Sequence, residues 1–155
     1  MYARDVMTRE VPTISLRKTV AEAIRLIKSN VGDDSFRNAA PGLVVVNERG
    51  EFAGIFTPLL VITRFLEEAR RQPPAAGITP EYLASLASRF ETTTVASVME
   101  RQAISVTEEA LVTDVAELFA MHRFQRIPVV SGKKVVGIIY RSRLMFALTE
   151  GLTAG

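Results

Sequence analysis

Residues 126–139 read RIPVVSGKKVVGII, two apolar runs separated by the short polar stretch SGKK. Valine and isoleucine favour extended backbone, and apolar runs without polar alternation are typical of strands buried on both faces. Serine and glycine between two such runs favour a tight turn. Residues 43–56, LVVVNERGEFAGIF, show the same pattern. The sequence therefore predicts the same buried hairpin at two places in the chain.

The segments around the two hairpins repeat as well, and in the same order. Each copy begins with a Val-Met pair, continues with a short β-type segment and an amphipathic helical pattern, and ends with a helix after the hairpin. The matched segments are 5–8 and 97–100, 11–14 and 103–106, 19–27 and 111–119, and 57–71 and 141–148. Self-similarity over a unit of this length indicates two supersecondary units that pack on each other.

We therefore predict an α+β fold made of α/β-type repeats. Two β-α-β-β-α units, residues 1–71 and 95–155, are expected to pack sheet to sheet about a pseudo-twofold axis. The residues expected to be buried in this shared core are Val44, Val46, Ile55, Val129 and Ile138.

Two segments interrupt the symmetry of the repeats. The residue offset is 92 between Val6 and Val98 but 83 between Gly54 and Gly137, so the first repeat has nine extra residues, which we place within 31–42. The connector 72–94 contains Thr-Pro-Glu at residues 79–81, which is typical of a helix start. This helix is expected to reach about residue 90 and to dock its apolar face on the core or on a second subunit.

Composition excludes several kinds of site. Among 155 residues there is no cysteine and only one histidine, His122, so thiol chemistry, disulfides and a zinc site are not expected. Asp33, Asp34 and Asn38 supply too few oxygens to predict a cation site. The sequence also lacks a Ser-His-acid arrangement and a glycine-rich phosphate loop, so we do not expect an enzyme. No apolar stretch is long enough to cross a bilayer, and a cytoplasmic protein is the default expectation.

The net charge of +2 does not by itself predict a nucleic-acid partner. The charges are unevenly distributed, because residues 118–149 contain six basic side chains and no acidic one. The six are Arg123, Arg126, Lys133, Lys134, Arg141 and Arg143. They form either a solvated basic edge or, where several converge, an anion site. Nucleic-acid binding through this basic half is a weaker reading.

The duplicated order of these motifs resembles a tandem pair of cystathionine-β-synthase (CBS) domains, also called a Bateman module. The resemblance covers nearly the whole chain except the connector and the extra residues, and it is strongest over residues 126–139. It implies two clefts between the repeats, which in many members bind adenosine nucleotides and report energy state to an attached enzyme or transporter. The nucleotide signature of the family is Gly-apolar-apolar-Thr/Ser-x-x-Asp, in which the Asp holds the ribose.

Both repeats depart from that signature. The first reads GIFTPLL at residues 54–60, which keeps the hydroxyl as Thr57 and has Leu60 in place of the carboxylate. The second reads GIIYRSR at residues 137–143, with Tyr140 in place of the hydroxyl and Arg143 in place of the carboxylate. Arg126 matches a basic position that contacts phosphates in some nucleotide-binding members.

The resemblance therefore implies ligand binding without a ribose acceptor from the signature. We expect Arg126, Tyr140 and Arg143 to form an anion site in the second cleft, and weaker binding or none in the first cleft beside Thr57. The full set of candidate ligand-binding residues is Arg126, Tyr140, Arg143, Thr57, Ile104 and Pro128. The expected ligand is AMP, ADP, ATP or another small anion. Thr57 is also explained as a helix N-cap, and Tyr140 as an aromatic cover of the core edge.

Other readings remain open at this point. A ligand-free interaction module is the alternative to a ligand sensor, and an unidentified regulated protein is a further expected partner. A homodimer is expected through the closing helix of each repeat, because apolar residues gather on these helices. The residues concerned are Val61, Phe65, Leu144 and Phe146.

Overall fold

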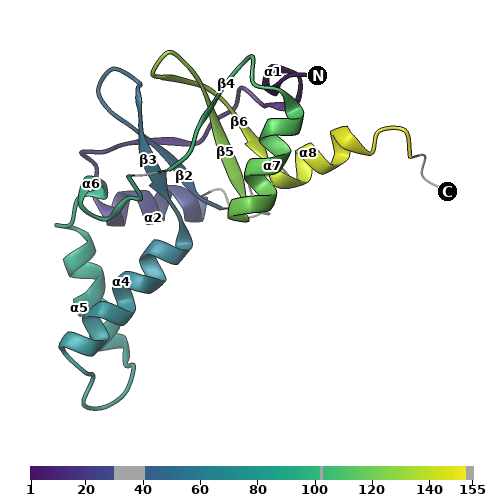
Figure 1. Ribbon diagram of the computed structural model, residues 1–155. Coiled ribbons are helices and arrows are strands. Elements are labelled where there is room, and N and C mark those ends of the chain that lie inside the picture. The colour runs from purple at the N-terminus through teal and green to yellow at the C-terminus, as the bar shows by residue number, and fades with distance from the viewer. Residues whose placement is uncertain (30–40, 102, 153–155) are drawn as a thin grey trace.

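The computed structural model describes residues 1–29, 41–101 and 103–152, and two three-stranded sheets lie at its centre (Figure 1). The first sheet holds β1 (Thr13–Ser15), β2 (Leu43–Val46) and β3 (Phe52–Phe56), and the second holds β4 (Val106–Thr107), β5 (Arg126–Ser131) and β6 (Lys134–Tyr140). In each sheet the middle strand pairs in parallel with the first strand and antiparallel with the third. This shared topology confirms the predicted duplication.

Each sheet carries helices on its outer face. The helices of the described residues are α1 (Ala3–Val6), α2 (Val20–Ser29), α4 (Pro58–Arg71), α5 (Pro80–Phe90), α6 (Val95–Val98), α7 (Val112–His122) and α8 (Arg141–Leu148). We call the sheet β1–β3 with α2 and α6 the first half, and the sheet β4–β6 with α1, α7 and α8 the second half. Local sequence signals set two of the helix starts. The Thr19 hydroxyl accepts from the Glu22 amide at 3.1 Å while the Glu22 carboxylate accepts from the Thr19 amide at 3.0 Å. Thr79 caps α5 by accepting from the Tyr82 amide at 3.1 Å.

The segment that leads into each repeat pairs with the opposite sheet. Thr8 and Ile138 exchange two backbone hydrogen bonds of 2.9 and 3.0 Å, and Glu100 and Ile55 exchange two of 3.0 and 3.2 Å. The glycine before each isoleucine permits this approach, because a Cβ on Gly54 would lie 2.6 Å from the Glu100 carbonyl oxygen. As a result α1 belongs to the core of the second half and α6 to that of the first half. The packing units thus differ from the sequence repeats 1–71 and 95–155.

The two sheets face each other, and both faces of each sheet are buried. Val44, Ile55, Ile138 and Tyr140 form the cluster between the sheets. Alternate residues point outward instead, toward the helices of their own half. Val129 is one of these, so the expectation that it lies between the repeats is wrong, although its side chain is fully buried.

The strand register shows that the nine extra residues of the first repeat lie in two places. Ile14 pairs with Val45 and Val106 pairs with Val129, which gives separations of 31 and 23 residues and hence a difference of eight. The ninth extra residue lies in the hairpin, since the pairs Val45–Gly54 and Val129–Gly137 are nine and eight residues apart. Most of the predicted insertion, with Asp33, Asp34 and Asn38, lies outside the described residues.

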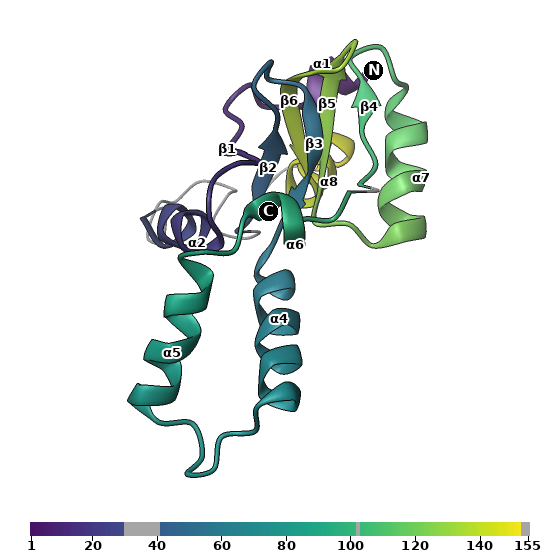
Figure 2. The ribbon, with the colours of Figure 1, turned by 90° about the vertical axis from the view of Figure 1, so that its left-hand side faces the viewer.

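Helices α4 and α5 form a hairpin that projects away from the sheets (Figure 2). At its base, Leu86 and Phe90 of α5 pack on the core of the first half, so the predicted docking of the connector helix is confirmed. Farther out, the Glu68 carboxylate of α4 is buried and forms ion pairs with Arg89 of α5 and Arg71 of α4. The hairpin is therefore held by apolar contacts at the base and by buried charge farther along.

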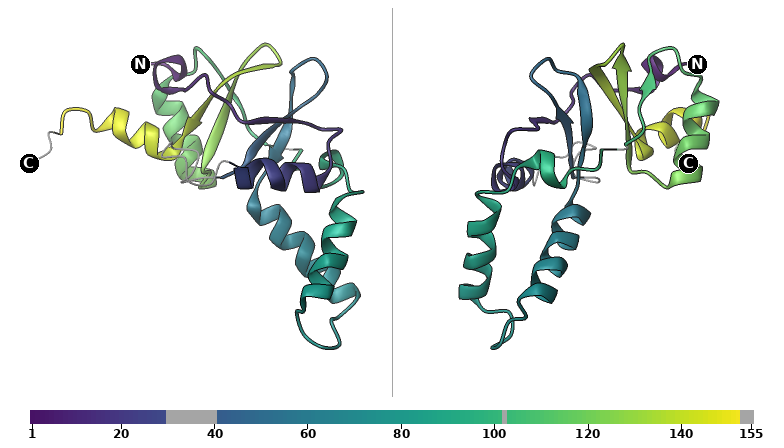
Figure 3. Two further views of the ribbon diagram at one scale, coloured as in Figure 1. Left: turned by 180° about the vertical axis from the view of Figure 1, so that it is seen from behind. Right: turned by 60° about the vertical axis from the view of Figure 1, so that its left-hand side comes forward.

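The closing helices α4 and α8 extend in different directions from the sheets (Figure 3), and both expose apolar side chains. These residues are Leu59, Ile62, Leu66, Met145, Phe146 and Leu148. Leu144, expected at a dimer surface, is instead buried in the core of the second half, and Val61 is partly buried against that of the first half. Within the described ranges, none of the helices combines the length and the apolar character needed to cross a bilayer.

Candidate functional site

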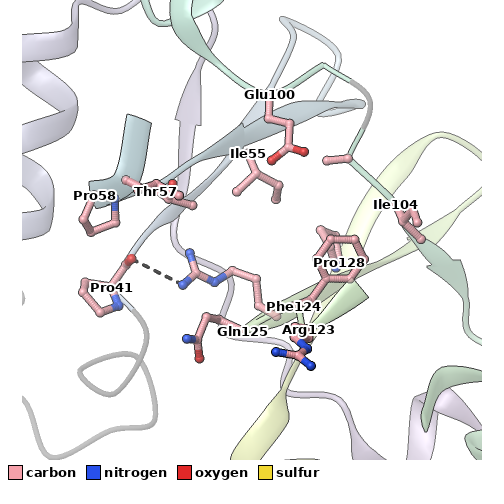
Figure 4. Close-up of a pocket in the computed structure, with 13 residues that line it drawn as sticks. Pro41, Ile55, Thr57, Pro58, Glu100, Ile104, Arg123, Phe124, Gln125 and Pro128 are labelled. Atoms are coloured by element: carbon pink, nitrogen blue, oxygen red, sulfur yellow. Dashed lines mark hydrogen bonds between the residues drawn. The ribbon is translucent and has the colours of Figure 1, made fainter. Parts of the chain in front are cut away.

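A cavity of about 440 Å³ lies between the two halves, where β3 leads into α4 and α7 leads into β5. Its first-half wall includes Ile55, Thr57 and Pro58, and its second-half wall includes Ile104 and Arg126. Figure 4 shows the labelled side chains arranged around this space. The predicted residues Thr57, Ile104, Arg126 and Pro128 all line it.

Arg126 is the most unusual of these side chains, because a charged residue is seldom buried without a partner. Only 8% of its surface is exposed. Its Nη2 donates to the Pro41 carbonyl oxygen at 3.3 Å, the bond that is dashed in Figure 4. Among the described residues, Nε and Nη1 have no hydrogen-bond partner. Burial lowers the pKa of the Arg126 guanidinium from its usual value, and Tyr140 opposes this effect. An arginine guanidinium nevertheless remains protonated in proteins, so the cavity holds a cation that is incompletely paired among the described residues.

The guanidinium reaches across from the second half to lie on the backbone of the first. Leu43 pairs with Phe56 as Ile127 pairs with Ile139, so Gly42 occupies the position that Arg126 occupies in the other repeat. A Cβ on Gly42 would collide with Nη1 of Arg126 and lie 2.8 Å from its Cζ. The absence of a side chain at residue 42 therefore makes room for the arginine. Sequence reasoning missed Gly42, and the signal was its register opposite Arg126.

Thr57 precedes α4 in extended backbone, at the N-cap position. Its hydroxyl makes no capping hydrogen bond, so the side chain that lines the cavity is not used by the helix. Leu60, at the signature's carboxylate position, packs on the first-half core instead. The loss of the signature carboxylate thus adds an apolar contact to that core.

Arg123 and Gln125 add polar groups to the second-half wall of the cavity. Arg123 ends α7 with φ of 56°, a left-handed conformation that glycine or asparagine usually adopts. The Gln125 side-chain oxygen accepts from Arg141 at 2.9 Å, outside the cavity lining. Of the six basic residues between 118 and 149, only Arg123 and Arg126 line the cavity.

Tyr140 and Arg143 lie outside the cavity lining, so the structure does not bring the expected three side chains together. Tyr140 pairs with Arg126 across the sheet, but it is only 2% exposed and belongs to the cluster between the sheets. The Arg143 Nε donates to the Val6 carbonyl oxygen at 3.1 Å, on the α1 side of the second half. Moreover, Thr57 and Arg126 share one cavity rather than separate clefts, because the arginine crosses between the halves.

The arrangement of strands and exchanged segments corresponds to a known family. The protein-family model of the CBS domain matches residues 3–62 and 95–150. The chain belongs to the CBS-domain family. Both sequence repeats match, so the chain is a tandem CBS pair.

Known CBS proteins resemble this chain over most of its length. The CBS domain-containing protein YhcV of Bacillus subtilis is 28% identical over 137 residues, which cover 88% of this chain and 77% of YhcV. A crystal structure of a CBS domain-containing protein of unknown function from Kribbella flavida has a TM-score of 0.73 at 25% identity, covering 96% of this chain and 99% of that one. The structure of CBSX2 in complex with AMP has a TM-score of 0.70 at 20% identity, covering 96% of each chain.

The described residues give no comparable grouping of metal ligands. No cluster of three or more His, Asp or Glu side chains placed to hold a metal occurs among them. His122 lies at the end of α7, as expected, with its ring stacked on Phe124 at a centroid distance of 4.9 Å.

Proposed function

We propose that this CBS pair is a regulatory module, and not an enzyme, that binds a small anionic ligand in the cavity between its halves. The observation that carries the proposal is the Arg126 guanidinium, which is buried and has two nitrogens without partners among the described residues. A buried cation is costly unless it is paired, and an oxyanion accepts the planar fork of a guanidinium through two hydrogen bonds. The cavity therefore favours an occupant that carries an oxyanion.

An adenosine nucleotide is the first ligand to test. The volume of about 440 Å³ falls within the range typical of small-molecule sites. The apolar side chains of Ile55, Ile104 and Pro128 offer a surface for a flat ring system. Thr57 and Arg123 line the same cavity and offer polar contacts. CBSX2, which shares the fold, was crystallised with AMP.

Calorimetry of AMP and adenosine tests this proposal. We expect AMP to bind and adenosine to bind much more weakly, since only AMP carries the phosphate. Arg126→Ala should abolish AMP binding. Arg143→Ala is the matched control, because Arg143 lies outside the cavity and should leave the affinity unchanged.

The opposite results decide between the remaining readings. Equal binding of adenosine and AMP, or unaltered binding by Arg126→Ala, would contradict an anion site at this arginine. No binding of AMP, ADP, ATP or inorganic phosphate would favour a ligand-free interaction module. Thermal melting of each variant establishes that it is folded before its affinity is compared.

We also propose a homodimer formed through the exposed faces of α4 and α8. The two helices are equivalent under the pseudo-twofold relation of the repeats, and both present apolar side chains to solvent. A second copy carries the same pair of faces, so one isologous interface can cover both at once. Leu59 adds a link to the ligand, because it belongs to the exposed face of α4 and also lines the cavity.

A further inference from the structure

The cavity has a second charged wall, formed by Glu100. Among the described residues that line the cavity, Glu100 carries the only carboxylate. Figure 4 shows Glu100 on the opposite side of the space from Arg123 and Gln125, with its carboxylate turned toward the interior. It forms no ion pair with any residue in the described ranges.

The position of Glu100 is fixed by backbone structure. It follows the short helix α6, and its N–H and C=O exchange hydrogen bonds of 3.0 and 3.2 Å with Ile55. Because this pairing ties Glu100 to β3, its side chain starts from a defined point on the cavity wall. The side chain itself is exposed, so substitutions there remove the carboxylate without disturbing the core.

The cavity thus has two chemically different ends. The buried Arg126 offers N–H donors to an anion, whereas Glu100 offers only acceptors. The same cavity is also lined by apolar side chains, including Ile55, Ile104 and Pro128. An anionic group placed beside Glu100 is repelled, and a hydrogen-bond donor placed beside Arg126 finds no acceptor on its side chain.

We infer that Glu100 selects ligands that carry hydroxyl or amino donors at the end opposite their anionic group. The inference rests on the proposed function, because it requires an anion beside Arg126. It extends that function by assigning the orientation in which the ligand binds and its chemical class. The ligand is a phosphorylated compound whose other end carries hydrogen-bond donors, such as a nucleoside monophosphate. Leu60 cannot provide a hydrogen-bond acceptor at the signature position. Glu100, on a different segment of the chain, then supplies it.

Calorimetry with AMP as the probe tests the inference on the full chain. Glu100→Ala should weaken AMP binding by about tenfold, the usual order for the loss of one charge-assisted hydrogen bond. Glu100→Gln keeps one acceptor oxygen and should give an intermediate loss. Glu117→Ala is the control, because this exposed acid on α7 does not line the cavity.

Ligand analogues identify the donor. One analogue, 2′,3′-dideoxy-AMP, lacks the sugar hydroxyls, and another, purine riboside monophosphate, lacks the amino group of the base. One of them should bind the wild type about tenfold more weakly than AMP, again the order of one charge-assisted hydrogen bond. The same analogue and AMP should bind Glu100→Ala equally. This coupling distinguishes a direct contact from a general effect on the cavity.

The results separate this inference from the proposed function. If AMP binding requires Arg126 but Glu100→Ala binds AMP as well as or better than the wild type, the role of Glu100 is overturned and the anion site stands. Tighter binding by Glu100→Ala would mean that the carboxylate only repels the phosphate. If the wild type binds neither AMP nor inorganic phosphate, both proposals fail together.

Discussion

At the scale of single residues, Arg126 is a buried cation whose hydrogen-bonding groups are only partly paired among the described residues. Its guanidinium is removed from water, yet two of its nitrogens find no partner among the described residues. Replacement of a buried charged group by an apolar side chain of similar length is often neutral or stabilising. We therefore expect Arg126→Met to raise the free energy of unfolding by about 1 kcal/mol in phosphate-free buffer. Urea unfolding measures this change, and a destabilised variant would mean that the guanidinium is well paired in the free protein.

Arg123 presents a similar conflict in its backbone. Its φ of 56° is the one positive value at a non-glycine residue in the described ranges, and a side chain in this conformation costs about 1 kcal/mol relative to glycine. Arg123→Gly should therefore stabilise the protein by roughly that amount in urea unfolding. The same variant should bind AMP more weakly, because it removes a cation from the cavity wall. An Arg123→Gly protein with lower stability would contradict the strain argument.

At the scale of secondary-structure elements, the α4–α5 hairpin depends on one buried acid. Glu68 accepts hydrogen bonds from Arg71 and Arg89, and it is almost fully buried, whereas Arg89 is partly exposed. Glu68→Ala should lower the hydrogen-exchange protection of α5 amides, with a local cost of about 1–2 kcal/mol after allowance for the exposed partner. Glu67→Ala is the control, because Glu67 pairs with Arg64 at the surface of the same helix. Equal exchange in both variants would show that apolar contacts alone hold the hairpin.

Val129 tests the packing between the sheet β4–β6 and the helices of the second half. Its side chain is fully buried in the core of the second half. Val129→Ala should therefore lower the free energy of unfolding by about 2–3 kcal/mol as a cavity forms. A loss below about 0.5 kcal/mol in urea unfolding is typical of a surface site and would place Val129 outside the core.

Elements whose signals are local could be predicted from the sequence. Both hairpins and the helix start at Thr79 depend on residues a few positions apart, and the structure confirms them. The four-residue helices α1 and α6 could not be predicted, because their stability comes from packing on the sheet of the other repeat. Features that require a partner distant in sequence were therefore missed.

The candidate site shows the same limit. Arg126 was identified from its position before a buried strand and its match to a basic family position, but the cavity that it enters is completed by residues of the other repeat. Its neighbour Gly42 became visible only through strand register, and Glu100 only through its pairing with Ile55. Arg143 matched a signature position, yet its side chain follows the exchanged segment toward Val6.

At the scale of the whole molecule, the exposed apolar faces of α4 and α8 predict a dimer. Multi-angle light scattering should report about twice the chain mass of 17.1 kDa at micromolar concentration. Ile62→Glu should shift the protein toward monomers, because Ile62 lies at 55% exposure on the face of α4. Lys28→Glu introduces a glutamate on the surface of α2 instead, and this variant should remain dimeric. A wild-type monomer at all concentrations would contradict the proposed interface.

The exchange of leading segments between the halves has a consequence for biosynthesis. Helix α1 is synthesised well before its packing partners β6 and α8. The first half likewise lacks α6 until residues 95–98 have been made. The first sheet therefore cannot complete its core while its own repeat is being translated, although domains that are contiguous in sequence commonly fold as they emerge. The two repeats are therefore expected to complete their folding together, and a translation stop after the first repeat leaves a fragment with an unfilled core.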